Sequence, residues 1–350
     1  MIEKRNAKQI LTSLLAGPKT FWRLIREQDG HLVHYVRLLE KLEGENLIDL
    51  DGGRIRLTEE GRALCQQQGL RPRQDTACPA CGGRGLELKG IFGRALEEFR
   101  EIARERPPAL ADFDQGHVDA ASAVARAALI YARGDLENED ILILGDDDLT
   151  SIALALTGTE SRITVLEADG RLVDFINRAA EKNGWKNLRA RRYDVRDPLP
   201  GELRRKFGVF LIDPVETMPG ITLFLYRCAL GLRGKGAAGY IGLTHLEASR
   251  EKWHAIQKLL LEMNFVITEI IHDFNEYELA SEEFIEKFGA ARPRWGKLCP
   301  PEVNWFTSNL VRVEAVEELK VPETAGAAGE EMFRDGTKFY CDEETFDALW

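Results

Sequence analysis

Apolar residues in the second part of the chain fall into short runs that alternate with longer amphipathic segments. The runs have the length of strands, about four to eight residues, and the segments between them repeat their apolar positions with a helical period. Repeated strand–helix units predict an α/β fold with a doubly wound, mostly parallel sheet, in which ligands bind at the carboxyl ends of the strands. Strands are expected at 141–144, 162–166, 187–192, 207–212, 237–243 and 265–271, and helices at 115–133, 149–156, 171–182, 223–232 and 249–262.

The first 70 residues have a different pattern. Three helix-periodic segments, near 10–15, 21–25 and 32–42, precede two short apolar runs that flank Asp51-Gly52-Gly53. Such a turn favours a hairpin, and Thr58 is a good start for one more helix. This order predicts an N-terminal winged helix. Residues 1–70 carry 11 Lys and Arg against 10 Asp and Glu, so scaffolding or dimerisation is favoured over DNA recognition, which needs a basic face.

We predict four parts along the chain: a winged-helix domain over 1–70, a linker with a connecting helix over 71–114, a Rossmann-like catalytic domain over 115–315, and a flexible C-terminal tail over 316–350. Residues 322–331 have the composition of a tether, and 333–350 are interpreted as a lid or a mobile tail.

The linker contains Cys78-Pro79-Ala80-Cys81, which resembles half of a zinc site. A structural zinc needs four ligands, so a plain turn is the favoured interpretation and zinc shared between two subunits is the alternative. We predict no metal ligand in the functional site. The six cysteines are too scattered for a disulfide framework in a chain of this length.

Composition limits the partners. The 350 residues are 44% hydrophobic and contain no apolar run of membrane-spanning length. The polar first residues do not have the pattern of a signal peptide, so a cytoplasmic location is expected. A net charge of −11 disfavours binding to nucleic acid and permits cationic ligands.

The sequence Gly145-Asp146-Asp147-Asp148 directly follows the apolar run 141–144, where a dinucleotide-binding fold has a glycine-rich loop for phosphates. Two carboxylates about 5 Å apart repel each other by roughly 3 kcal/mol at an effective dielectric of 20. An anionic cofactor would increase this repulsion and a polycation would relieve it. Asp148 is also interpreted as the N-cap of the next helix, which accounts for one of the three acids.

Carboxylates follow the next strands as well. Glu167 and Asp169 are candidates for hydrogen bonds to a ribose diol, because an ionised carboxylate accepts two at once. Asp194 is a candidate acceptor for an adenine amine. In the sequence Asp213-Pro214-Val215-Glu216, the proline restricts Asp213 to extended geometry, which can direct its carboxylate at an amine. These residues predict a nucleoside pocket without a phosphate site; the alternative is that they are solvated strand-end carboxylates.

Glu276 and Tyr277 follow the last predicted strand. They offer a carboxylate and an aromatic ring to an ammonium group. An exposed turn is the alternative.

Three of these motifs, with the winged helix and the cysteine linker, resemble one family over roughly residues 1–315: the branched-chain polyamine synthases of thermophiles, or N4-bis(aminopropyl)spermidine synthases. The motifs are Gly145-Asp146-Asp147-Asp148-Leu149-Thr150-Ser151, Asp213-Pro214-Val215-Glu216-Thr217 and Asp273-Phe274-Asn275-Glu276-Tyr277. Val215 departs from the second proline that is usual in the family loop. The resemblance implies transfer of aminopropyl groups from decarboxylated S-adenosylmethionine, a co-substrate, to the secondary amine of spermidine, with release of methylthioadenosine and no tightly bound cofactor.

In such a reaction the acceptor nitrogen must lose a proton before it attacks, and a carboxylate can accept it. We predict that Asp147, Asp148 and Asp213 are catalytic, with the base either Asp147 or Asp148. The predicted donor-binding residues are Gly145, Asp146, Glu167, Asp169 and Asp194, and the predicted polyamine-binding residues are Asp146, Glu216, Glu276 and Tyr277.

Two other functions stay open. An S-adenosylmethionine-dependent methyltransferase acting on an amine or a nucleic acid would share the sheet and the proline loop, but this chain lacks the Gly-x-Gly motif and an aromatic residue after Val215. A winged-helix regulator with a nucleoside-sensing domain is disfavoured by the near-neutral charge of residues 1–70. A homodimer is possible.

Overall fold

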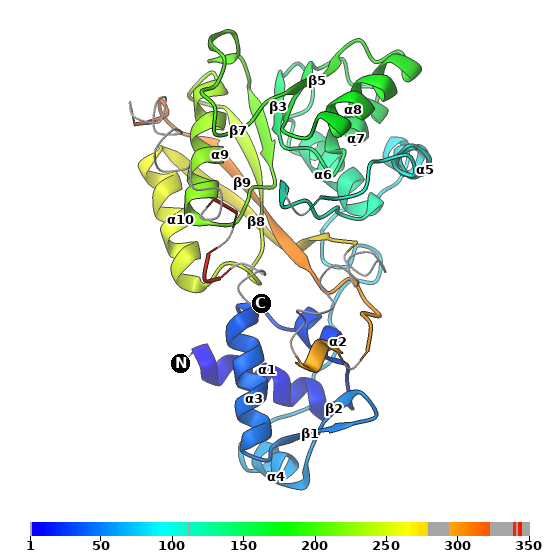
Figure 1. The fold of residues 1–350 in the computed structure, drawn as a ribbon, viewed down its shortest axis with the longest axis vertical. Coiled ribbons are helices and arrows are strands. Elements are labelled where there is room, and N and C mark those ends of the chain that lie inside the picture. The colour runs from blue at the N-terminus through cyan, green and yellow to red at the C-terminus, as the bar shows by residue number, and fades with distance from the viewer. Residues whose placement is uncertain are drawn as a thin grey trace.

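A seven-stranded sheet forms the centre of the larger part of the molecule (Figure 1). The computed structural model describes residues 2–110, 113–278, 294–297, 299–322, 339–340 and 342–344. The strand order is β5-β4-β3-β6-β7-β9-β8. The strands are β3 (Ile141–Leu144), β4 (Ile163–Glu167), β5 (Leu188–Arg192), β6 (Val209–Ile212), β7 (Ala238–Leu243), β8 (Phe265–Glu276) and β9 (Thr307–Ala315).

Strands β3 to β7 pair in parallel, whereas β9 is antiparallel to both of its neighbours. The predicted doubly wound, mostly parallel, methyltransferase-like sheet is therefore confirmed. Strand β9 was not predicted as a strand. It follows β8 in the chain but inserts between β7 and β8.

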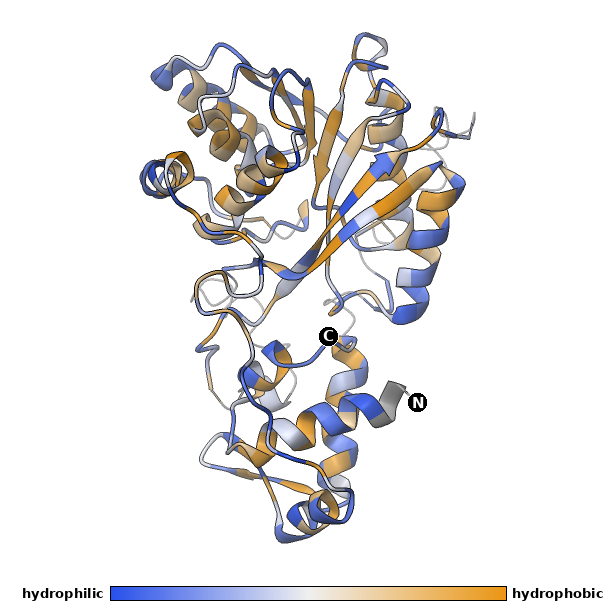
Figure 2. Cartoon of the chain, turned by 180° about the vertical axis from the view of Figure 1, so that it is seen from behind, coloured by the Kyte–Doolittle hydropathy of each residue, from blue (hydrophilic) through white to orange (hydrophobic). Residues whose placement is uncertain are grey.

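Helices cover both faces of the sheet because successive strand residues point to opposite sides. Ile141 and Ile143 of β3 belong to one apolar core, and Leu142 and Leu144 belong to the other. Figure 2 shows the resulting pattern, with hydrophobic residues concentrated on the inner strands. The first core is covered by α5 (Ile91–Ala103), α6 (Ala120–Ala132), α7 (Thr150–Leu156) and α8 (Gly170–Asn183), and the second by α9 (Met218–Gly231) and α10 (Arg250–Glu262).

The N-terminal residues form a separate core at one end of the molecule (Figure 1). The hydroxyl groups of Thr20 and Thr58 accept hydrogen bonds from the first turns of the helices that follow them, as N-caps do. The predicted order of three helices, a hairpin and a fourth helix is confirmed. The elements are α1 (Ile2–Leu15), α2 (Phe21–Arg26), α3 (Leu32–Gly44), β1 (Ile48–Asp51), β2 (Arg54–Leu57) and α4 (Glu59–Gln67).

Residues from the sheet domain complete this N-terminal core. Leu246, Trp295 and Trp305 are buried within it, and the backbone amide of Leu32 donates to the carbonyl of Leu246 at 2.9 Å. The short 3₁₀ helix η3 (Arg294–Lys297) packs on α2; a second one, η2 (Gly201–Leu203), precedes β6. The N-terminal part is therefore attached to the sheet domain through shared apolar side chains.

Several predicted element bounds and one predicted cap are wrong. Helix α9 begins at Met218 and not at 223, and β8 continues to Glu276 and does not end at 271, so Glu276 lies in the strand and does not follow it. Helix α6 begins at Ala120 and not at 115, because Asp119 caps it by accepting from the amide of Ser122 at 2.7 Å. Asp148 does not cap α7: the N-cap is Leu149, in left-handed geometry with φ 57°. Asp148 is instead directed towards α6.

The flexible C-terminal tail stays a prediction. Most of the proposed tether and of 333–350 lies outside the described residues. Within the described part, Phe339 is buried against the second core. No helix in the described ranges combines the length and apolar composition needed to cross a bilayer.

The two-sided core makes a stability prediction. Leu142 is fully buried, whereas Leu261 on α10 is 62% exposed. We expect Leu142→Ala to lower the free energy of unfolding by about 2–5 kcal/mol. Leu261→Ala, the matched control, should change it by less than about 0.5 kcal/mol. Denaturant unfolding of both variants measures the difference, and equal losses would contradict this packing.

Candidate functional site

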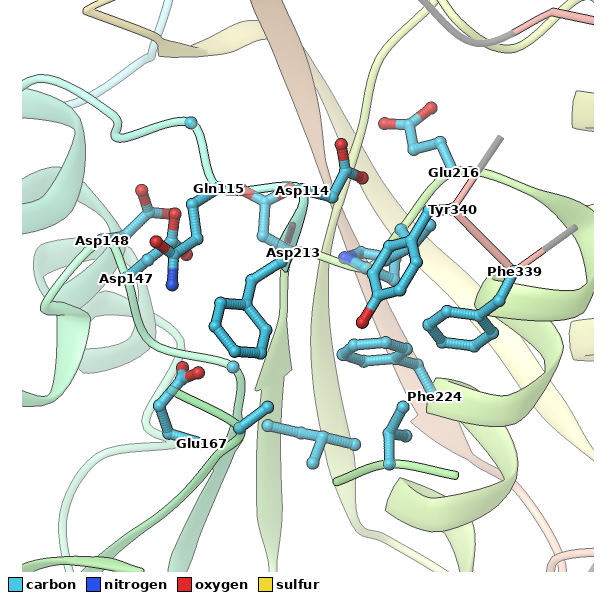
Figure 3. Close-up of a pocket in the computed structure, with 18 of the residues that line it drawn as sticks. Asp114, Gln115, Asp147, Asp148, Glu167, Asp213, Glu216, Phe224, Phe339 and Tyr340 are labelled. Carbon is cyan, nitrogen blue, oxygen red and sulfur yellow. The ribbon is translucent and has the colours of Figure 1, made fainter. Parts of the chain in front are cut away.

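A cavity lies at the carboxyl ends of β3, β4, β5 and β6, where the sheet topology places a ligand site. Figure 3 shows its side chains pointing inward from these strand ends and from the described part of the C-terminal segment. None of the described lining residues is Lys, Arg or His. Eight of them are carboxylates: Asp114, Asp147, Asp148, Glu167, Asp194, Asp213, Glu216 and Glu247.

The two neighbouring acids Asp147 and Asp148 have different surroundings. Asp148 is buried, accepts from the amide of Val118 at 2.7 Å and forms an ion pair with Arg126 at 2.6 Å. The carboxylate of Asp147 has no hydrogen bond or ion pair with any described residue, and the residue keeps partial solvent exposure. Burial, together with the charges of Asp148, Glu167 and Asp213, raises the pKa of Asp147 well above its ordinary value. Of the two acids, Asp147 is therefore the one free to accept a proton.

Arg126 on α6 neutralises the other acids of this group. It is 1% exposed and contacts Asp148, Asp213 at 2.5 Å and the Asn275 side chain at 2.8 Å. Although burial lowers the pKa of a guanidinium, the charges of Asp148 and Asp213 raise that of Arg126. The prediction missed this residue. The signal was available, since an arginine within the apolar run 123–130 needs a buried partner.

Asp213 has two donors on one oxygen, Arg126 and the Tyr277 hydroxyl, the latter at 2.6 Å. Burial and the charge of Asp148 nevertheless raise its pKa. Asp213, Asp147 and Asp148 all line the cavity, so the structure brings the three predicted catalytic residues together.

Asp146, Asp169 and Glu276 are not among the lining residues. The Asp146 carboxylate accepts from the Ser151 amide at 3.3 Å, at the start of α7. Asp169 caps α8 and pairs with Arg171 at 2.6 Å. Glu276 pairs with Arg26 of the N-terminal part at 3.1 Å. These three carboxylates hold neighbouring elements in place and do not reach the cavity.

Gly145, Glu167 and Asp194, all predicted to bind the donor, do line the cavity. Glu167 is 5% exposed, and its two oxygens accept from the amides of Asp146 and Asp169, both at 2.8 Å. Burial raises its pKa. Burial acts the same way on Asp194, but its ion pair with Arg196 lowers the pKa of Asp194 overall.

Glu216 lies at the other side of the cavity, as Figure 3 shows. One of its oxygens accepts from the amide of Thr244 at 2.6 Å. The other is buried without a hydrogen-bond partner in the described structure. Burial, with the charge of Glu247, raises the pKa of Glu216 well above its ordinary value. A cationic group of a ligand could satisfy this oxygen. Tyr277 also lines the cavity, but its hydroxyl is bound to Asp213.

Aromatic rings close the same side. Phe224, Phe339 and Tyr340 lie close together in Figure 3. The C-terminal residues are anchored, since the Thr217 hydroxyl donates to the Phe339 carbonyl at 2.7 Å and Lys252 pairs with Asp342 at 2.9 Å. These rings, and also Asp114 and Gln115, were not identified from the sequence, because none of them belongs to a motif; Gln115 and Phe224 fall within predicted helices, whose apolar period does not indicate a binding role.

Cys78 and Cys81 do not belong to any group of three or more His, Cys, Asp or Glu side chains that lie close enough to share a metal ion within the described ranges. The acidic lining of the cavity and the raised pKa of Asp147 together indicate the chemistry that the cavity supports. It can bind cations next to a carboxyl group that can take up a proton.

Comparisons agree with this arrangement. The family model of the branched-chain polyamine synthase A C-terminal domain matches residues 94–346. The chain is 40% identical over 333 residues to N(4)-bis(aminopropyl)spermidine synthase of Thermus thermophilus, covering 95% of this chain and 93% of the relative. It is 38% identical to the enzyme of that name from Thermococcus kodakarensis, covering 95% and 94%.

A solved structure is also similar. The branched-chain polyamine synthase from Thermus thermophilus, in complex with N4-aminopropylspermidine and 5'-methylthioadenosine, aligns with a TM-score of 0.79 and 38% identity, covering 91% of this chain and 89% of that one. With a family model that covers most of its length and relatives similar nearly from end to end, the chain belongs to the branched-chain polyamine synthase family.

Proposed function

We propose that this enzyme transfers aminopropyl groups from decarboxylated S-adenosylmethionine to the secondary amine of spermidine, giving N4-aminopropylspermidine, N4-bis(aminopropyl)spermidine and methylthioadenosine. One observation carries the proposal: the cavity is lined by eight carboxylates and by no basic described residue. Both reactants are cations, and removing the donor's carboxylate removes the one group that this lining would repel. The relatives bearing the synthase name support the same reaction.

The donor's nucleoside fits the ends of β3, β4 and β5. Glu167 is positioned for the ribose hydroxyls, since each of its oxygens has a lone pair left after binding one amide. Gly145 has φ 78°, a conformation that costs a glycine little and lets the backbone approach a ligand closely. Asp194 and Tyr193 line the part of the cavity next to this position. The sulfonium then faces Asp147 and Asp213.

Asp147 is the proposed base. It accepts a proton from the acceptor ammonium; the freed nitrogen lone pair forms a bond to the carbon next to the sulfonium, and the carbon–sulfur bond breaks with its electrons going to sulfur. Arg126 holds Asp148 and Asp213 in fixed positions, so they orient the amine. Asp147 releases its proton to solvent afterwards. Glu216 holds a distal ammonium group.

Four further assignments belong to this proposal. The N-terminal helices and hairpin are assigned as a winged helix that serves as a scaffold, because they share a core with the sheet domain. A homodimer and a cytoplasmic location are the expected assembly and compartment. Decarboxylated S-adenosylmethionine acts as a co-substrate and not as a resident cofactor.

The reaction is tested by incubating the enzyme with S-adenosylmethionine or its decarboxylated form and a panel of polyamines, followed by mass analysis. We expect aminopropyl additions to spermidine with the decarboxylated donor only, because the carboxylate of the parent compound meets the acidic lining. Methylated products without aminopropyl products would make the chain a methyltransferase.

Replacing the base should remove one ionisation. We expect Asp147→Asn to lower kcat for the first addition by roughly 10²–10⁴-fold. Because the pKa of Asp147 is raised and the base must be ionised, kcat/KM of the parent should rise with pH through that pKa. This rise in the pH profile, its acidic limb, should vanish in Asp147→Asn. The part of the profile that reports ionisation of the acceptor amine should persist.

The exposed Asp174→Asn on α8 serves as the control and should match the parent in both measurements. If the Asp147→Asn enzyme kept the acidic limb of the pH profile, Asp147 would not be the base, and Asp148 would be assigned that role.

The unpaired oxygen of Glu216 makes a binding prediction. A hydrogen bond to a charged group contributes about 1.5–3 kcal/mol, so Glu216→Gln should weaken spermidine binding by roughly 10-fold to 150-fold. Calorimetry in the presence of methylthioadenosine measures this affinity. Glu202→Gln, which changes an exposed acid in η2, should leave it unchanged. Equal affinities in the parent and Glu216→Gln would exclude Glu216 from the acceptor site.

A further inference from the structure

His245, His272 and Asp273 lie together outside the residues that line the cavity. His245 is in the turn that follows β7, and the other two are in β8. One donor atom from each residue lies within 4.8 Å of the others. Two imidazoles and a carboxylate at such spacing are a ligand set for a divalent transition metal.

A β-bulge places two of these side chains. The pairing of β8 with β9 shifts between Ile271 and Asn275, so His272 and Asp273 leave the regular ladder. Asp273 has φ 50°, a left-handed conformation that few non-glycine residues adopt. Bulges re-aim side chains and are common beside functional sites. The irregular backbone here brings the side chains of His272 and Asp273 close to His245 in the turn after β7.

His245 supplies an independent observation. It is 4% exposed, yet neither of its ring nitrogens has a hydrogen-bond partner among the described residues. Buried polar atoms are normally paired, so this ring lacks a partner that the described protein does not provide. The ring stacks on His272 with centroids 5.5 Å apart and an angle of 14° between the planes. The two imidazoles are therefore held side by side.

The hydrogen bonds and ion pairs of the Asp273 carboxylate leave one of its lone-pair sites available to a ligand. Its Oδ1 accepts from the Thr307 hydroxyl at 2.8 Å, and its Oδ2 lies 2.9 Å from Arg26 and 3.1 Å from His272. A carboxylate has about four lone-pair sites, so one site on Oδ1 is unused. Carboxylates that bind metals are commonly fixed by such neighbouring hydrogen bonds.

The surrounding charges help to choose the ion. Arg26 and Arg250 oppose Asp273 and Asp29 around the histidines. This near balance gives little attraction for calcium or magnesium, which bind through carboxylate charge and oxygen ligands. A metal that bonds to imidazole nitrogen depends less on that charge.

We propose that His245, His272 and Asp273 bind a divalent first-row transition metal, Zn²⁺ in the first instance, with water as the fourth ligand. The ion would fasten the turn after β7 to strand β8. This turn contains Thr244, whose amide binds Glu216, and Glu247, which lines the cavity. The site therefore has a structural role at the acceptor side of the cavity.

The test uses the full-length protein without a histidine tag, in a Cys78→Ser, Cys81→Ser background that removes the other candidate zinc ligands. After exposure to Zn²⁺ and dialysis, we expect one bound zinc per chain by elemental analysis. His245→Gln and His272→Gln should each weaken Zn²⁺ binding by more than roughly 100-fold, since they remove a ligand itself and not only its support. The exposed His254→Gln is the matched control and should bind as the parent does.

Two further readouts keep the test independent of activity and of folding. Bound Co²⁺ should give a tetrahedral absorption spectrum in the parent and none in His245→Gln. Zn²⁺ should raise the Tm of the parent and of His254→Gln, but not of His245→Gln or His272→Gln, whose folding is checked by circular dichroism. No stoichiometric zinc in the parent, or zinc retained by a folded His245→Gln protein, would overturn the proposal.

Discussion

The cavity depends on the electrostatic balance between a group of buried carboxylates and one buried guanidinium. Arg126 contacts Asp148 and Asp213 with almost no exposure to solvent. A charge pair without water is costly unless the geometry and the hydrogen bonds are good, and here the Asn275 side chain, the Val118 amide and the Tyr277 hydroxyl supply them. Without this cation, the carboxylates of Asp148 and Asp213 would repel each other with no compensating charge between them.

The three acids of the loop 146–148 have different contacts and therefore different roles. The Asp146 carboxylate fixes the start of α7, Asp148 forms an ion pair with Arg126, and the Asp147 carboxylate stays without a hydrogen-bond partner among the described residues and has a raised pKa. Three identical side chains in a row thus become a support, a fixed charge and a proton acceptor. What separates them is the direction in which the backbone turns each one, set in part by the left-handed Leu149.

Much of this was predictable because strand ends are easy to locate. The apolar runs identified the parallel strands. At the carboxyl end of each of β3, β4, β5 and β6, at least one carboxylate lines the cavity. The side-chain directions were not predictable. Asp169 and Glu276 lie at strand ends, as Glu167 and Asp213 do, yet each forms an ion pair with a nearby arginine, Arg171 or Arg26, that directs it away from the cavity. The position of Phe339 at the cavity was not predictable for another reason. No local sequence pattern connects it to Thr217, which lies more than a hundred positions earlier in the chain.

The place of β9 in the sheet has a consequence for synthesis of the chain on the ribosome. Strand β7 ends at Leu243 and pairs along its outer edge with β9, which begins at Thr307. Strand β8 emerges before β9 and has no other partner in the large sheet. Until residue 315 has left the exit tunnel, both strands present unpaired edges that invite pairing between nascent chains. The sheet domain can therefore be completed only after β9 has been synthesised, and β9 is the segment that removes this exposure to aggregation.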